Sequence, residues 1–393
     1  MARYRFLSAA LAAASLLIIS ASAEAKVIKV HPGDSIQAAV DQANPGDTVQ
    51  VAPGTYTETG QPCPTEPSNT CAVVIAKDDI SLVGMGGKGK SVTLQGSGQD
   101  DGIGVGNTGT DGGPNCLTDP SDPNLLPLHG SLIRGLTVQG FADDGVKLFC
   151  VAGWRVSDVT ARDNEEYAIF PSHSFNGRVD HSFASGAHDT GFYIGQSFNS
   201  RMDHNVATEN VSGYEIENSI GVKADHNVAH DNTGGILSFT LPGLDAKVNS
   251  GNVIAHNSVR DNNAPNECSG GSVCEVPSGS GILLVAADSN SVRHNQVTGN
   301  NSFGIGVVNI CVAQQLDPTE CAAVSTDIQP DSDGNHIVRN TVLGNGTDPD
   351  PVLPSPVFAV DLAWDGLGDG NCWTGNVFNT FFWPGVPDPL PAC

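Results

Sequence analysis

Basic residues are scarce in this chain: 18 lysines and arginines stand against 43 aspartates and glutamates, for a formal net charge of −25. Such a balance repels nucleic acid and anionic membrane surfaces, which argues strongly against both as partners. The same field repels a polyanionic glycan, which would need a local basic patch or a bridging cation such as calcium. The charge therefore restricts which partners the chain can hold.

Long apolar runs are missing after the first residues. The chain opens with Arg3 and Arg5, an apolar run over residues 7–19 and the small residues Ala23-Glu24-Ala25, which together predict a signal peptide over residues 1–25. That run is too short to span a bilayer. We therefore expect an exported protein, secreted or periplasmic, without a membrane span.

No pair of cysteines has the CxxC spacing of a zinc site. Ten cysteines in an exported chain instead predict disulfides, whose connectivity the sequence leaves open. Short separations favour Cys63–Cys71, Cys268–Cys274 and Cys311–Cys321, and a looser guess pairs the rest as Cys116–Cys150 and Cys372–Cys393.

Aromatic residues make up only 6% of the chain, whereas 46 glycines and 24 prolines suit a turn-dense all-β protein. A repeat supports this class. Three segments align at offsets of 23 and 22 residues: Arg178-Val-Asp-His181, Arg201-Met-Asp-His204 and Lys223-Ala-Asp-His226. A period of this size predicts a stacked β-solenoid.

The solenoid is expected to fill residues 26–393 as one domain. Residues 26–60 predict an N-terminal cap and first coil, in which Ser35 caps a short helix that covers the open end of the stack. Residues 130–345 hold the regular repeats, and residues 346–393, richer in aromatics and proline, predict the far cap. At ~4.8 Å per coil, roughly 11 to 13 coils would make a rod about 50 to 60 Å long.

Period-2 alternation predicts which side chains point into the core. Two inward columns are expected: Val146, Ile169, Phe192, Tyr214 and Ile236; and Leu148, Pro171, Ile194, Ile216 and Ser238.

One polar column consists of histidines, each directly before a serine or an asparagine: His181, His204, His226, His256 and His294. Five imidazoles at one coil position are compatible with cation binding. The asparagines favour a different interpretation, because identical amides at a turn stack and hydrogen-bond from coil to coil as an asparagine ladder. We expect mainly the ladder, with the histidines beside it, and predict a second ladder through Asn164, Asn210 and Asn232.

Paired carboxylates form a second column. Asp143 and Asp144, then Glu166, then Asp189 occupy nearly the same position in successive coils, about 5 Å apart. Carboxylates this close could perform acid–base chemistry or bind calcium, with Asp143, Glu166 and Asp189 as the ligands. The alternative is a solvated acidic turn.

Outward positions of the same strands form a mixed strip: Lys147, Phe170, Tyr193, Glu215 and Leu237. One step further lie the candidate substrate-binding residues His173, Gln196, Glu217 and Asn218. Such a strip suits a carbohydrate groove, with aromatic faces for sugar rings and polar groups for hydroxyls. Lys147 or Tyr193 could serve as base or acid, and Glu215 or Asp144 could neutralise a uronate carboxylate through a cation. An ordinary exposed strand is the alternative.

Two sets of motifs carry a family resemblance. The opening, Pro32-Gly-Asp-Ser-Ile-Gln-Ala-Ala39 followed by Pro53-Gly-Thr-Tyr56, resembles that of pectin-lyase-like proteins. Residues 130–309 resemble a family of exported bacterial parallel β-helix repeat proteins, through motifs such as Thr190-Gly-Phe-Tyr-Ile-Gly-Gln-Ser197 and Gly213-Tyr-Glu-Ile-Glu-Asn-Ser219. The resemblance implies a single-stranded right-handed parallel β-helix but no particular activity. The fold implied by this resemblance is similar to that of copper-delivery β-helix proteins, but the presence of only three methionines argues against that function.

The function expected from these patterns is contact with a polysaccharide or cell-envelope glycan outside the cytoplasm. Two versions stay open: a lyase- or hydrolase-like enzyme that uses the carboxylates and the strip, and a non-catalytic glycan-binding or structural envelope protein. Calcium is the one cofactor the acidic column suggests.

Overall fold

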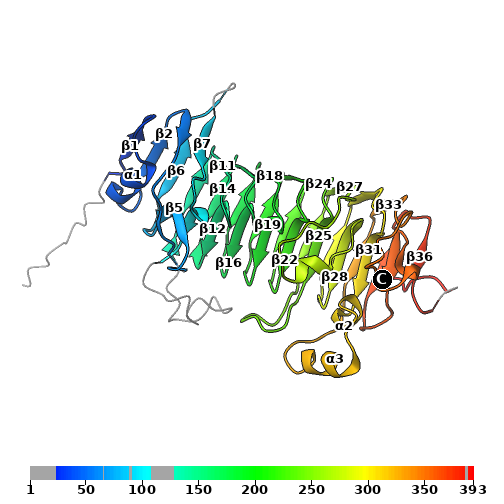
Figure 1. The fold of residues 1–393 in the computed structure, drawn as a ribbon. Coiled ribbons are helices and arrows are strands. Elements are labelled where there is room, and N and C mark those ends of the chain that lie inside the picture. The colour runs from blue at the N-terminus through cyan, green and yellow to red at the C-terminus, as the bar shows by residue number, and fades with distance from the viewer. Residues whose placement is uncertain (1–23, 65, 88–90, 108–127, 386–387) are drawn as a thin grey trace, which may run out of the picture.

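A computed structural model describes residues 24–64, 66–87, 91–107, 128–385 and 388–393 of the chain. Nearly all of the expected signal peptide and Cys116 lie outside these residues, so the cleavage and the Cys116–Cys150 pair stay predictions. The described residues form a rod of stacked coils (Figure 1). The fold is the expected right-handed parallel β-helix, in which each coil contributes one short strand to each of three sheets.

The sheets are named here A, B and C. In the described residues they hold 12, 10 and 12 strands. Sheet A consists of β1 (Val27–Val30), β2 (Thr48–Val51), β6 (Ser81–Gly84), β10 (Leu132–Arg134), β14 (Arg155–Ser157), β17 (Arg178–Asp180), β20 (Arg201–Asp203), β23 (Lys223–Asp225), β26 (Val253–Ala255), β29 (Ser291–Arg293), β32 (His336–Val338) and β35 (Cys372–Thr374). Sheet B consists of β3 (Gly54–Tyr56), β7 (Val92–Gln95), β11 (Thr137–Gln139), β15 (Thr160–Arg162), β18 (Phe183–Ser185), β21 (Val206–Thr208), β24 (Val228–His230), β27 (Ser258–Arg260), β30 (Gln296–Thr298) and β33 (Thr341–Leu343).

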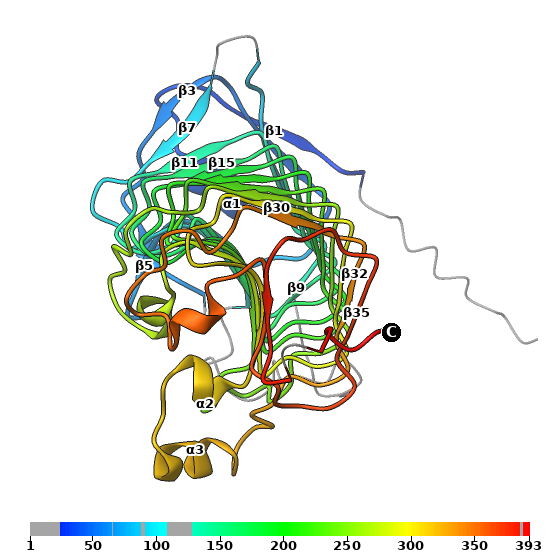
Figure 2. The ribbon, with the colours of Figure 1, turned by 90° about the vertical axis from the view of Figure 1, so that its right-hand side faces the viewer.

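Sheet C consists of β4 (Gln61–Pro62), β5 (Thr70–Ile75), β8 (Asp101–Val105), β12 (Val146–Phe149), β16 (Ile169–Ser172), β19 (Thr190–Gly195), β22 (Ser212–Glu217), β25 (Gly234–Phe239), β28 (Ser280–Val285), β31 (Phe303–Val308), β34 (Leu362–Trp364) and β36 (Phe381–Phe382). A further pair joins β9 (Leu128–His129) to β13 (Val151–Ala152). Seen along the rod, the coils superpose closely around one core (Figure 2).

The strand register confirms the expected inward columns. Val146 pairs with Ile169, Ile169 with Phe192, and Phe192 with Tyr214. All of these side chains are fully buried. Because the chain repeats one coil length, like residues fall above like residues, and their stacks form a single continuous core.

The N-terminal end is covered by the short helix α1 (Ile36–Gln42), which lies at the blue end of the rod in Figure 1. The Ser35 side chain accepts a hydrogen bond from the Ala38 amide, as its sequence position predicted. Glu58 accepts a second one, at 2.6 Å from the Ile36 amide. Ile36 and Val40 point into the core, so the helix closes the stack with apolar side chains.

Asparagine ladders run along the turns between the sheets. Asn227 is typical: its Oδ1 accepts from the Asn205 amide at 3.1 Å, and its Nδ2 donates to the Met202 carbonyl at 2.9 Å. The same pattern continues from coil to coil through Asn257, Asn295, Asn340 and Asn376. The second expected ladder, through Asn210 and Asn232, is also present. The amides thus satisfy buried backbone groups at each turn.

Insertions gather on the side of sheet C towards the C-terminal end. Residues 310–324, which include Cys311 and Cys321, contain the helices α2 (Ile310–Ala313) and α3 (Pro318–Val324), which project from the rod in both views. Single 3-10 turns occur at Ser272–Glu275 and Pro356–Phe358. No helix among the described residues is long and apolar enough to cross a membrane.

Four of the predicted disulfides are confirmed: Cys63–Cys71, Cys268–Cys274, Cys311–Cys321 and Cys372–Cys393. Three of these disulfides join cysteines within insertions on the sheet C side. The fourth joins Cys393 to Cys372 in β35.

Candidate functional site

The mixed strip on the outer face of sheet C has the predicted register but not the predicted exposure. Lys147 pairs with Phe170, and Tyr193 pairs with Glu215, which pairs with Leu237. Only 4% of Tyr193, 4% of Glu215 and 8% of Lys147 are exposed. The alternative of an ordinary exposed strand is therefore wrong at these positions, because Phe170 stacks on Tyr193 and Glu66 contacts Lys147.

Lys147 is the cation at the N-terminal end of this strip. Its Nζ lies 3.0 Å from Asp144 and 2.9 Å from Glu66, and 5.4 Å from the centre of the Phe170 ring. Burial alone would lower the pKa of Lys147, but the carboxylates of Asp144, Asp101 and Glu66 raise it above its ordinary value. Lys147 therefore stays protonated, and the structure favours a charge-neutralising role over that of a base.

The acidic column is present as predicted, because the Glu166 amide bonds to the Asp143 carbonyl and the Asp189 amide to the Glu166 carbonyl. A hydrogen bond to Asp143, together with burial, raises the pKa of Glu166 to about 9. The Glu166 carboxyl is therefore protonated at neutral pH. The Asp189 side chain instead accepts a hydrogen bond from the Thr190 hydroxyl.

A different trio brings its oxygens within 4.8 Å of one another: Asp101, Asp143 and Asp144. Lys147 already supplies a positive charge beside Asp144, so these carboxylates have a countercharge without a metal. Calcium at Asp143, Glu166 and Asp189 stays a prediction.

Three aromatic rings separate the Lys147 end of the strip from the next acidic group. Phe170 and Tyr193 stack at 4.4 Å between ring centres, and Tyr167 contacts both rings, at 4.5 and 5.2 Å. The rings fix the position of the Tyr193 hydroxyl.

The charges of three carboxyl groups on this and the next coil act on that hydroxyl, and the four residues are together called the carboxylate–tyrosine cluster: Asp189, Tyr193, Glu215 and Glu217. The Tyr193 hydroxyl donates to the Glu217 carboxylate. Asp189 accepts from the Thr190 hydroxyl at 2.9 Å. Glu215 and Glu217 point to the same face of β22, with Cα atoms roughly 6.6 Å apart for a two-residue step along a strand.

Burial sets the protonation of this cluster. It raises the pKa of Asp189 to about 6 and that of Glu217 to about 7, although the Tyr193 hydrogen bond opposes the second shift. Burial and the charges of Asp189 and Glu217 raise the pKa of Glu215 well above its ordinary value. At neutral pH a protonated carboxyl therefore lies beside an ionised one, which is the arrangement of an acid and a base. Burial also raises the pKa of Tyr193, which makes it a hydroxyl donor and not a base.

The predicted substrate-binding residues beyond the strip contact a neighbouring segment. Gln196 Oε1 accepts from the amides of Asp245 and Ala246, at 2.9 and 3.2 Å. Asn218 exchanges hydrogen bonds with Leu241. Both hold the segment after β25 against the strand ends.

His173 lies in the same row as Gln196 and Asn218. Its Nδ1 is 2.9 Å from the Ser172 hydroxyl, and its Nε2 is 3.6 Å from Asp245. A substrate contact by His173, Gln196 or Asn218 stays a prediction.

A cavity begins at Glu215 and continues over the outer faces of β25, β28, β31 and β34. Its empty volume is about 870 Å³, including the part open to solvent. The lining is almost wholly apolar, with Phe239, Phe303 and Phe358 among the lining residues. Glu215 is thus the member of the carboxylate–tyrosine cluster that faces open space.

Sequence reasoning missed Asp101, Tyr167 and the cavity. A signal for Asp101 existed, since Asp100-Asp101-Gly102 at the start of β8 matches Asp143-Asp144-Gly145 just before β12, and these strands are neighbours. The cavity had no signal, because its walls come from insertions that do not follow the repeat.

Comparison with known proteins relates the chain to one family. The profile of the family described as "Periplasmic copper-binding protein (NosD)" matches residues 130–375. No curated protein matches the chain in sequence.

Solved structures share the fold at low sequence identity. The A-module of the mannuronan C-5 epimerase AlgE6 from Azotobacter vinelandii is 16% identical, with a TM-score of 0.59 over 90% of this chain and 95% of that one. The periplasmic alginate epimerase AlgG, solved in a mutant form, is 15% identical, with a TM-score of 0.54 over 90% of this chain and 73% of that one. The Dettilon tailspike protein is 11% identical, with a TM-score of 0.52 over 91% and 62%.

Proposed function

The chain belongs to the family described as periplasmic copper-binding protein (NosD), and we propose that, outside the cytoplasm, it acts on a polysaccharide by acid–base chemistry at the carboxylate–tyrosine cluster. Three buried carboxyl groups with raised pKa values on neighbouring coils, one of them bonded to the Tyr193 hydroxyl, carry this proposal. A mannuronan C-5 epimerase and an alginate epimerase share the fold, which supports a glycan substrate by analogy alone.

The electrostatics favour a neutral glycan over a polyuronate. The cation described on this face, Lys147, is already paired with Asp144 and Glu66. The whole chain carries a formal charge of −25. An anionic polymer would therefore meet repulsion at the cluster as well as at long range. The phenylalanines of the cavity offer apolar faces for sugar rings.

Hydrolysis fits the protonation states better than elimination. Glu215, protonated and facing the cavity, can give its proton to the glycosidic oxygen. Asp189, with a pKa of about 6, can take a proton from the attacking water. Tyr193 keeps Glu217 in place through its hydrogen bond. Elimination at a uronate would need Lys147 or Tyr193 as base, and both are held protonated.

The test is incubation of the purified, disulfide-intact protein with a panel of neutral glycans and polyuronates, with and without calcium. We expect new reducing ends from a neutral glycan, and a loss of about 100-fold or more in Glu215→Gln, since a general acid contributes on that order. Glu267→Gln, at an exposed position, is the matched control and should retain full activity. Neither reducing ends nor unsaturated products across the panel would exclude the enzyme, and retention on a glycan without any product would favour the non-catalytic binder.

A further inference from the structure

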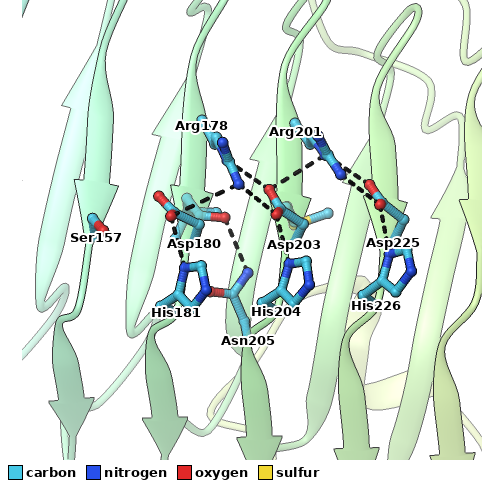
Figure 3. A network of polar contacts seen from close by, with 12 residues as sticks. Ser157, Arg178, Asp180, His181, Arg201, Asp203, His204, Asn205, Asp225 and His226 are labelled. Atoms are coloured by element: carbon cyan, nitrogen blue, oxygen red, sulfur yellow. Dashed lines mark hydrogen bonds and ion pairs between the residues drawn. The ribbon is translucent and has the colours of Figure 1, made fainter.

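The outer face of sheet A is polar in the middle of the rod, and its charged side chains pair with one another. Arg178 binds Asp203 through both Nε and Nη2, and Arg201 binds Asp225 in the same way, as Figure 3 shows. The predicted column of five histidines lies beside these pairs, with ring centres 5.0 to 5.1 Å apart. An apolar stretch on the outer face of another sheet of this acidic chain therefore calls for an explanation.

Sheet C changes from polar to apolar beyond β22. The outward column that contains Tyr193 and Glu215 continues, coil by coil, through Leu237, Leu283, Gly306 and Ala363. The neighbouring column passes from Glu217 to Phe239, Val285 and Val308. Both columns thus become apolar at the same coil, and together they form the floor of the cavity that begins at Glu215.

Small residues deepen that floor. Gly306 and Ala363 continue the column in which earlier coils have Leu237 and Leu283. The backbone at Gly306 lies outside the left-handed region, so it does not require glycine, and a Cβ there would lie 3.1 Å from Leu283 Cδ1. The loss of side-chain volume along the column leaves a cavity of about 870 Å³, including its open part, which is within the size range of small-molecule sites.

Three insertions form the walls of the cavity: residues 272–277, helix α2 and residues 353–358. The disulfides Cys268–Cys274 and Cys311–Cys321 stabilise the first two. Apolar walls that are fixed in place cannot collapse onto one another, so they keep the cavity open for a ligand.

Hydrogen bonds join the three walls to one another. The Asp350 carboxylate accepts from the Ser278 amide at 3.1 Å, and the Gln315 side chain donates to the Val352 carbonyl at 3.1 Å. The third insertion is thereby held against both of the others. The cavity is therefore preformed, which lowers the cost of ordering it around a ligand.

The lining does not suit a bare sugar over most of its extent. Its polar members are Glu215, Ser272, Glu275 and Gln314, and the remaining residues are apolar. A buried sugar hydroxyl without a hydrogen-bond partner loses the bonds that it makes to water. Phe239, which pairs with Glu217, can stack on a sugar ring beside the carboxylate–tyrosine cluster, but the floor beyond it offers hydroxyls no partner.

We propose that this cavity binds a long saturated hydrocarbon chain attached to an uncharged sugar, with the sugar at Glu215 and the chain over β25, β28, β31 and β34. This substrate class rests on the proposed function for its sugar end. Four neighbouring strands span roughly 14 Å at ~4.8 Å per step, which suits an extended chain better than a small substituent.

The charges around the cavity favour an uncharged head group. Glu215 and Glu275 are the ionisable residues of the lining, which holds no lysine or arginine among the described residues. Burial raises the pKa of Glu215, so its carboxyl stays protonated and can donate to a sugar oxygen without a countercharge. A fatty-acid carboxylate would find no cation here and would be repelled by the formal charge of −25.

The experiment is calorimetric titration of the purified, disulfide-intact protein with maltosides that carry hexyl, octyl and decyl chains, each below its micelle-forming concentration. We expect the Kd to fall about 15-fold for every two added methylenes, because each buried methylene contributes about fourfold in affinity. The heat-capacity change of binding should be negative. Maltose without a chain should bind at least tenfold more weakly than hexyl maltoside.

Two variants alter the cavity in different ways. Ala313→Trp, on α2, places a large side chain in the cavity from a partly exposed position. Leu283→Gln keeps the volume of the floor but adds an amide without partners. Each should weaken decyl maltoside binding at least tenfold, with circular dichroism and thermal unfolding as checks of the fold. The matched control is Ala322→Trp, at an exposed position on α3, which should bind as the wild type does.

A Kd that does not change with chain length, or equal affinity of the wild type and both cavity variants, would overturn the proposal. Decanoate that binds as tightly as decyl maltoside would overturn the uncharged head group. A wild-type dimer that Ala313→Trp dissociates would assign the cavity to a second copy of the chain instead.

The same titration separates this proposal from glycan cleavage. Decyl maltoside binding without cleavage of any glycan would support the chain site and count against the chemistry at the carboxylate–tyrosine cluster. Cleavage of an unsubstituted glycan without any binding of alkyl maltosides would have the opposite meaning.

Discussion

At the scale of single residues, the site depends on burial more than on residue type. Glu215 and Glu217 are two carboxyls on the same face of one strand, yet each has its own partners: Tyr193 donates to Glu217, while Glu215 faces the cavity. Burial raises the pKa of both. The same residue types on an exposed strand would both be ionised and would have no division of roles.

The raised pKa of Glu217 predicts a specific dependence of stability on pH. The folded-state pKa is about 7, against an ordinary value near 4.3 in the unfolded chain. Between these values the folded state holds more protons than the unfolded state, so this group's contribution to stability is complete below about 4.3 and is lost as the pH rises through about 7.

Glu217→Gln, which stays neutral, should therefore lose less stability than the wild type between pH 5 and pH 8, by about 2 to 4 kcal/mol. Urea unfolding at several pH values measures the difference. Glu267→Gln should follow the wild-type curve, and a Glu217→Gln curve parallel to that of the wild type would show that the carboxyl is ionised in the folded protein.

At the scale of the repeated coil, the asparagine ladders decide the stacking. Each ladder amide satisfies a backbone group in the coil before it, and every such group is buried. A row of apolar residues at this turn would leave buried N–H and C=O groups without partners. The ladder is thus a condition for stacking coils whose turns pack tightly.

Asn227→Ala should destabilise the protein by about 2 kcal/mol or more, because it removes the acceptor of the Asn205 amide and the donor to the Met202 carbonyl. His226→Asn, one residue earlier and exposed, should change stability by less than about 1 kcal/mol. Thermal or urea unfolding of both variants tests this, and equal effects at the two positions would contradict the ladder's role.

At the scale of the whole molecule, the rod separates stability from function. Each coil contacts mainly its two neighbours, so stability comes approximately from a sum of similar interfaces. The insertions that make the cavity project from this regular stack and contribute to one face only. A rod of this kind tolerates changes of length better than changes within a coil.

Deletion of residues 201–222 tests this separation. The deletion joins Ser200 to Lys223, which has the register of Arg201, so the stack should close on itself and remain folded. It also removes Glu215 and Glu217, and we therefore expect a cooperative unfolding transition together with complete loss of glycan cleavage. A shortened rod that still acts on the glycan would place the chemistry outside the carboxylate–tyrosine cluster.

Most of the fold was predictable from the sequence, because a solenoid is made of local repeats. The 22- and 23-residue offsets set the coil length, and alternation set the inward columns, which the register of Val146, Ile169 and Phe192 confirms. The asparagines marked the ladders, and short separations marked three disulfides. Each of these features depends on residues that are close in the chain or in adjacent coils, and the repeat length identifies which residues those are.

The repeat alone predicted a rod of stacked coils, its register and which residues share a column, and the family resemblance implied its right-handed sense. The folded structure was needed to show that the strip through Tyr193 is buried, that Asp101 lies beside Asp143 and Asp144, and that a cavity starts at Glu215. The physical reason is that burial and protonation depend on segments far apart along the chain, such as the insertions that meet over sheet C. A repeat specifies what lies above and below a residue, but not what folds back to cover it.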